Sequence, residues 1–162
     1  MAYHLIDNVH SKSLTPKEPN VELLDASCVR NIIVCLGNNI GKTFIASKLI
    51  QNTSNNISVN NGTITLYVAD SSVVVSRKAA YFQRLTNMLV AEYHKGNCNK
   101  IKKIKKIPKL DQIVVAETET ANYMLENELI VMSDINLLIL HDCHCVLKNG
   151  IVPQKEVIYL RN

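Results

Sequence analysis

Four short apolar runs recur along the chain, and each is nearly continuous rather than alternating with polar residues. That pattern is typical of parallel strands that are covered on both faces. The runs are residues 32–36, 63–69, 112–116 and 136–140. The stretches that follow the first three runs predict helices, over residues 42–51, 76–94 and 118–127. Strands that alternate with helices predict an α/β fold with a mostly parallel sheet and helices on both faces.

Two polar stretches interrupt this alternation. Residues 52–62 are rich in Asn and Ser, which predicts a surface loop. Residues 100–109 form a basic run with Ile at every third position, and Pro108 ends any helix there.

Composition narrows the class of protein. The chain has 162 residues, enough for one domain with a real core, and its 47% apolar and 20% charged residues are typical of a globular protein. The formal charge of +4 is compatible with a phosphate-bearing partner. No apolar run approaches the roughly 18 residues of a membrane span, so no membrane association is expected. The five cysteines do not form a disulfide framework, which predicts a reducing, cytoplasmic environment.

The strongest chemical motif is a phosphate-binding loop between the first predicted strand and its helix, Gly37 to Thr43. Backbone N–H groups at a helix N-terminus bind phosphate oxygens. In such a loop Lys42 neutralises the outer phosphates and the Thr43 hydroxyl holds Mg²⁺. The pattern therefore predicts ATP and Mg²⁺ as ligands, but weakly, because Gly37 stands one place late and Ile40 puts a stiff branched side chain on the loop. The alternative is a loop that keeps the fold and no longer binds ATP. The candidate nucleotide-binding residues of the loop are Gly37, Asn38, Asn39, Gly41, Lys42 and Thr43.

Three segments in order resemble the N-terminal helicase region of Dicer ribonucleases, which are superfamily-two helicases. Thr15-Pro16 followed by residues 21–24 resembles the helix that leads into that region. Residues 31–36 followed by 41–46 resemble its phosphate loop. Residues 133–139 followed by Asp142-Cys143-His144 resemble the strand that carries its Asp-Glu-Cys-His box. Among members of this family, these segments are most similar to the microRNA-type Dicer of arthropods.

The resemblance implies a RecA-like lobe. Residues 1–162 are expected to form a single helicase ATP-binding-type domain that stops after the second ATPase motif, without the second lobe or the ribonuclease III domains of Dicer. No ribonuclease activity is expected of these residues. The implied partners are double-stranded or precursor RNA, and the remaining Dicer domains or a double-stranded-RNA-binding protein.

The motifs depart from those of a working ATPase. In the family the Asp of the box orients Mg²⁺ and the Glu activates the attacking water, but here the positions hold His141 and Asp142. Imidazole is a poor ligand for Mg²⁺, and Asp is one methylene shorter than Glu, so Asp142 is a weak candidate for catalysis and metal binding. The adenine-recognition pair is replaced by Pro19 and Asn20, of which Asn20 keeps an amide. These changes predict absent or very slow hydrolysis.

RNA contacts are expected in the loops after the second and third strands, where the family touches the RNA backbone. The matching hydroxyls are those of Ser71, Ser72 and Thr118, and hydroxyls bind phosphate oxygens. The basic run adds lysines that either bind phosphate or lie in a solvated loop. These are Lys102, Lys103, Lys105 and Lys106.

Three other functions stay open. The chain is a working ATPase lobe if Gly41-Lys42-Thr43 suffices for turnover. It is an unrelated small P-loop kinase if a nucleoside lid and a catalytic Arg or Asp cluster follow the loop, which the sequence does not show. Zinc is a third alternative, disfavoured because alternate strand residues point to opposite faces. Its candidate ligands are His94, Cys98, His141, Cys143, His144 and Cys145.

Overall fold

The computed structural model describes residues 18–29, 41–56, 62–97 and 112–141. Four strands form one sheet in the order β2-β3-β1-β4, and all three pairings are parallel. The α/β fold with a parallel sheet is therefore confirmed. The strands are β1 (Ile64–Ala69), β2 (Val90–Tyr93), β3 (Ile113–Glu117) and β4 (Ile135–Leu140). The predicted strand over residues 32–36 lies outside the described residues.

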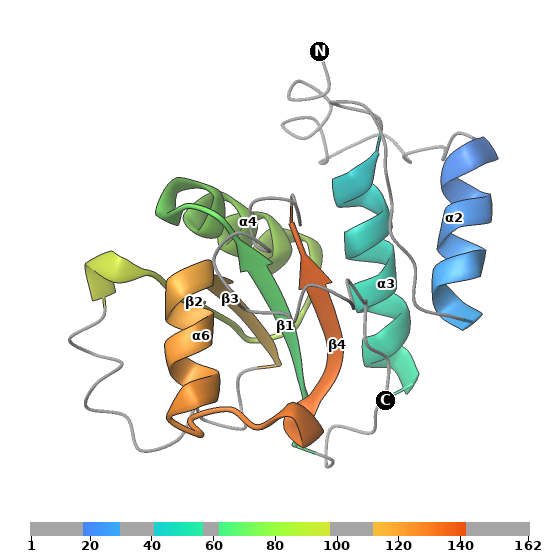
Figure 1. Ribbon diagram of the computed structural model, residues 1–162. Coiled ribbons are helices and arrows are strands. Elements are labelled where there is room, and N and C mark those ends of the chain that lie inside the picture. The colour runs from blue at the N-terminus through green and yellow to red at the C-terminus, as the bar shows by residue number, and fades with distance from the viewer. Residues whose placement is uncertain (1–17, 30–40, 57–61, 98–111, 142–162) are drawn as a thin grey trace.

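Helices cover both faces of the sheet (Figure 1). Helix α6 (Thr118–Glu126) lies on one face, where its Met124 belongs to the same apolar cluster as Leu66 of β1, Val114 of β3 and Leu138 of β4. Helices α3 (Lys42–Asn56) and α4 (Ser72–Leu85) lie on the other, where Ile50 and Phe82 pack with Tyr67 and the odd-numbered strand residues. Each large apolar side chain that is fully buried contributes about 1.5–3 kcal/mol.

Helix α2 (Glu18–Val29) forms an outer layer beside α3 (Figure 1). Its Leu23, Leu24 and Cys28 are partly buried against the cluster that α3 and α4 form on the sheet. A helix is thus present in the segment whose sequence resembles the lead-in helix of the family. Two short 3-10 turns, η1 (Lys95–Asn97) and η2 (Met132–Asp134), complete the described elements. No helix in the described ranges has the length and apolar character needed to cross a membrane.

The prediction of one helix over residues 76–94 is wrong. Helix α4 begins earlier, at Ser72, and ends at Leu85, where Thr86 becomes extended with φ −124° and ψ 154°. The chain then forms β2, which pairs with β3. The Leu89 carbonyl accepts N–H groups from Gln112 and Ile113 and fixes the start of this pairing. Pairing with a distant strand therefore decided the structure of residues 90–93, which the prediction had included in the helix.

The predicted loop over residues 52–62 begins too early. Helix α3 continues to Asn56 and lies in contact with α2. The Asn52 amide lies 3.7 Å from Cys28 Sγ, and Thr53 is buried. These tertiary contacts outweigh the weak helix propensity of Asn, Thr and Ser.

Candidate nucleotide site

The last residues of the predicted phosphate loop, Gly41 to Thr43, lie within the described part of the chain. Gly41 adopts a φ of 97°, a value that L side chains rarely adopt, and α3 begins at the next residue, Lys42. The Ile45 N–H donates to the Gly41 carbonyl at 3.0 Å and closes the first turn. In Figure 1, α3 begins at the end of the molecule towards which the strand arrows point. Gly41, Lys42 and Thr43 are thus placed together, at an end whose first N–H groups have no partner within the helix.

The Thr43 hydroxyl contacts a cation from another helix. Lys78 Nζ of α4 donates to Thr43 Oγ1 at 2.6 Å, across 35 positions of sequence. Both side chains are half-buried. The oxygen that the family resemblance assigns to Mg²⁺ therefore accepts a hydrogen bond from an ammonium group.

His141 follows the last residue of β4. Its N–H donates to the Val68 carbonyl at 2.8 Å, which extends the pairing of β4 with β1 by one residue. Its ring lies 6.0 Å from the Tyr67 ring, edge to face, and Tyr67 packs in turn on Phe82 at 5.2 Å. The position that carries a magnesium-orienting carboxylate in the family thus carries an imidazole that packs on a buried aromatic pair.

The two predicted RNA-contacting junctions differ in how they use their hydroxyls. Ser71 is extended, with φ −143° and ψ 151°, and its side chain makes no capping hydrogen bond to α4. Ser71 and Ser72 are both half-exposed. Thr118 is only 1% exposed, and its hydroxyl donates to the Ala69 carbonyl at 3.0 Å. A phosphate oxygen cannot reach the Thr118 hydroxyl in this arrangement, because that hydroxyl joins the end of β1 to the start of α6.

Two acidic side chains contact Lys95 at the start of η1. Glu117 accepts the Lys95 N–H at 3.0 Å, and Glu119 lies 2.7 Å from Lys95 Nζ. The site residues that the sequence did not reveal are thus Lys78 and Lys95. Neither sits in a recognisable motif, and both contacts join segments far apart in the chain.

Of the remaining predicted site residues, only Asn20 lies within a described element. Asn20 lies within the span of α2. The remaining candidates lie outside the described residues, and so do the cysteines of the zinc alternative. The candidates concerned are Gly37, Asn38, Asn39, Lys102, Lys103, Lys105, Lys106 and Asp142. Within the described part of the chain, no group of three or more His, Cys, Asp and Glu side chains could hold a metal ion.

Comparison with solved structures supports the fold. The chain matches a nuclease-deletion mutant of the Type ISP restriction-modification enzyme LlaGI, in complex with a DNA substrate mimic, with a TM-score of 0.58. Sequence identity is 13%, and the match covers 85% of this chain and 16% of that one. At this identity the likeness concerns the fold alone.

Comparison of sequences identifies the relatives. The chain is 28% identical to the endoribonuclease Dicer of Danio rerio and 31% identical to that of Gallus gallus, over 93% of its length in both cases. It is 28% identical over 89% of its length to the endoribonuclease Dcr-1 of Drosophila melanogaster. It spans only 8%, 8% and 6% of these proteins. The resemblance to the Dicer helicase region is confirmed. Residues 22–161 match the DEAD/DEAH box helicase model, and the chain therefore belongs to the DEAD/DEAH box helicase family.

Proposed function

We propose that this chain is a nucleotide-binding lobe of a Dicer-type helicase module that binds ATP but hydrolyses it very slowly or not at all. In small-RNA processing its role is to hold RNA or a partner protein rather than to drive unwinding. The observation that carries the proposal is the start of α3. Gly41 with its positive φ, Lys42 and the first N–H groups of the helix form a phosphate-binding end, whereas His141 replaces a metal-binding carboxylate.

The residues present fit the phosphates of ATP better than they fit Mg²⁺. Lys42 lies in the first turn of a 15-residue helix, where the helix dipole also favours an anion. Magnesium prefers oxygen ligands in near-octahedral geometry. The hydroxyl of Thr43 accepts a hydrogen bond from Lys78, and the imidazole of His141 offers no oxygen. The loss of both groups as ligands supports slow turnover.

RNA binding is proposed at the start of α4 rather than at the start of α6. Ser71 and Ser72 present half-exposed hydroxyls, whereas the Thr118 hydroxyl is buried and bonded. Lysines of the basic run, Lys102, Lys103, Lys105 and Lys106, are further candidates. Contacts of this kind position RNA without reading its sequence.

The test compares ATP binding and hydrolysis by the unaltered chain and by Lys42→Ala. The matched control is Lys48→Ala, because Lys48 lies in the same helix and is exposed. We expect Lys42→Ala to abolish measurable ATP binding and Lys48→Ala to leave it unchanged. Equal binding by all three proteins would contradict the proposal. Turnover near or above about 1 s⁻¹, in the range of ordinary enzymes, would favour a working ATPase instead.

A further inference from the structure

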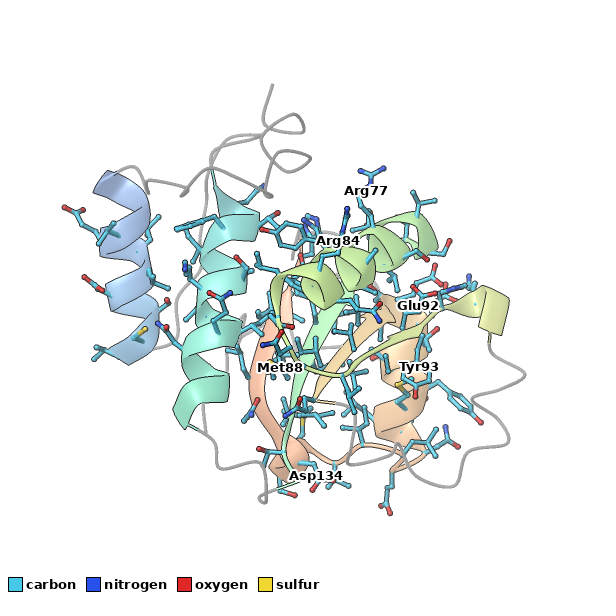
Figure 2. All side chains as sticks on the ribbon, turned by 180° about the vertical axis from the view of Figure 1, so that it is seen from behind. Arg77, Arg84, Met88, Glu92, Tyr93 and Asp134 are labelled. Carbon is cyan, nitrogen blue, oxygen red and sulfur yellow. The ribbon has the colours of Figure 1, made fainter. Side chains whose placement is uncertain are left out.

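Helices α3 and α4 are joined by a short contact between a hydroxyl and an ammonium. Lys78 Nζ lies 2.6 Å from Thr43 Oγ1, at the short end of the range for a hydrogen bond. The neighbouring cation of α4, Arg77, is exposed instead and points away from the body of the molecule (Figure 2). Helix α4 therefore directs one of two adjacent cations towards the start of α3 and the other away from it.

The same hydroxyl cannot serve both cations well. Magnesium binds oxygen ligands at about 2.0–2.1 Å, so an ion on Thr43 Oγ1 would lie about 4 Å from the Lys78 ammonium. At that distance a doubly charged and a singly charged cation repel each other strongly when partly shielded from water. The Thr43 hydroxyl is therefore placed to bind the Lys78 ammonium. With Lys78 in this position, the site does not fit Mg²⁺.

We propose that Lys78 takes the place of Mg²⁺ in this site, so that the chain binds nucleoside triphosphate without a divalent metal. Lysine is a compact point charge with three donors on a flexible four-carbon stem. That stem lets the ammonium reach from α4 to the start of α3, where Lys42 also lies. Two lysines then neutralise phosphate charge that is otherwise shared between one lysine and the metal. This inference rests on the proposed nucleotide binding.

The experiment measures ATP affinity of the 162-residue chain by calorimetry, once in EDTA and once in excess Mg²⁺. The unaltered chain is expected to bind ATP with about equal affinity in both buffers. Lys78→Met is expected to bind about tenfold more weakly in EDTA, the loss expected for one hydrogen bond to a charged group. Excess Mg²⁺ should restore part of that loss, because removing the ammonium frees the Thr43 hydroxyl for the metal.

Arg77→Met is the matched control, since it removes a positive charge from the adjacent position of the same helix. It should bind ATP like the unaltered chain in both buffers. Circular dichroism confirms that each variant is folded. Lys78→Gln serves as a second variant of similar length if Lys78→Met does not fold, with the same loss expected in EDTA.

Failure of the inference and failure of the proposed function give different results. ATP binding that requires Mg²⁺ in the unaltered chain, or equal losses in Lys78→Met and Arg77→Met, overturns the role of Lys78 and leaves nucleotide binding standing. Absence of ATP binding in both buffers, or binding that Lys42→Ala does not affect, overturns the proposed function and the inference with it.

Discussion

The interior of the sheet and its carboxyl edge use their side chains differently. The carboxyl edge is the end of the sheet at which Ala69, Tyr93, Glu117 and Leu140 lie. In the interior, strand residues on the two faces of the sheet fill two apolar clusters. Along the edge, and at the neighbouring start of α3, polar groups contact one another, as in the pairs Lys78–Thr43 and Thr118–Ala69.

The difference shows which polar groups of the molecule are used within the fold and which can bind a ligand. Ligands of open α/β sheets bind outside the carboxyl ends of the strands. A hydroxyl at that edge has less capacity for a ligand once it is hydrogen-bonded within the protein, whereas an ammonium with one internal hydrogen bond keeps two donors. Here the buried clusters are complete, whereas Thr43 and Thr118 are engaged in internal hydrogen bonds. The hydroxyls that the family resemblance assigns to a metal or to RNA thus make hydrogen bonds within the protein.

The largest expected effect comes from the interior. Phe82 is fully buried and packs on the rings of Tyr67 and Tyr81 at 5.2 and 5.6 Å. Phe82→Ala should lower the free energy of unfolding by about 3–5 kcal/mol, because it leaves a cavity among groups that cannot close in. Urea unfolding followed by circular dichroism measures this. The exposed neighbour Gln83→Ala should change stability by less than about 0.5 kcal/mol. Similar losses in both variants would contradict the description of the core.

A smaller effect sharpens the comparison at the start of α6, where two buried threonines differ in their partners. The Thr118 hydroxyl donates to Ala69, whereas that of Thr120 has no hydrogen-bond partner among the described residues. Thr118→Val should cost about 1 kcal/mol, because it leaves the Ala69 carbonyl without that donor. Thr120→Val should be neutral or stabilising, because it removes an unpaired buried hydroxyl. Thermal unfolding of both variants measures these changes in stability. A larger loss in Thr120→Val than in Thr118→Val would contradict the assigned role of the Thr118 hydrogen bond.

The smallest effect is expected from the ion pair at the rim. The Lys95 and Glu119 side chains are 62% and 61% exposed, so water and salt screen their 2.7 Å contact. A double-mutant cycle with Lys95→Met and Glu119→Gln should give a coupling below about 0.5 kcal/mol. A coupling above about 1 kcal/mol would mean that this pair is part of a tighter network at the carboxyl edge.

The central strands could be predicted from sequence because their signal is local. Continuous apolar runs identified β1, β3 and β4 to within one residue at each end. The edge strand β2 was missed because the apolar run at residues 88–91 directly follows the helical stretch and ends at Glu92, so nothing in the sequence separates it from the helix. Its formation depends on pairing with β3, which lies about twenty residues further along the chain.

The candidate site could be predicted only in part, because some of its contacts join segments that are far apart in the sequence. Gly41, Lys42 and Thr43 belong to a local motif, and the structure places them together at the start of α3. Lys78 belongs to no motif, and only the packing of α4 beside α3 brings it to Thr43. Burial of Thr118 is likewise a property of the assembled sheet, since its partner Ala69 ends a different strand.

The most direct test of the account is an ATP titration of the unaltered chain with and without Mg²⁺, with phosphate release followed in the same samples. The account predicts the same affinity in both conditions and no phosphate release above the protein-free blank. Binding that appears only with Mg²⁺, together with turnover near about 1 s⁻¹, would contradict it and identify a working ATPase lobe.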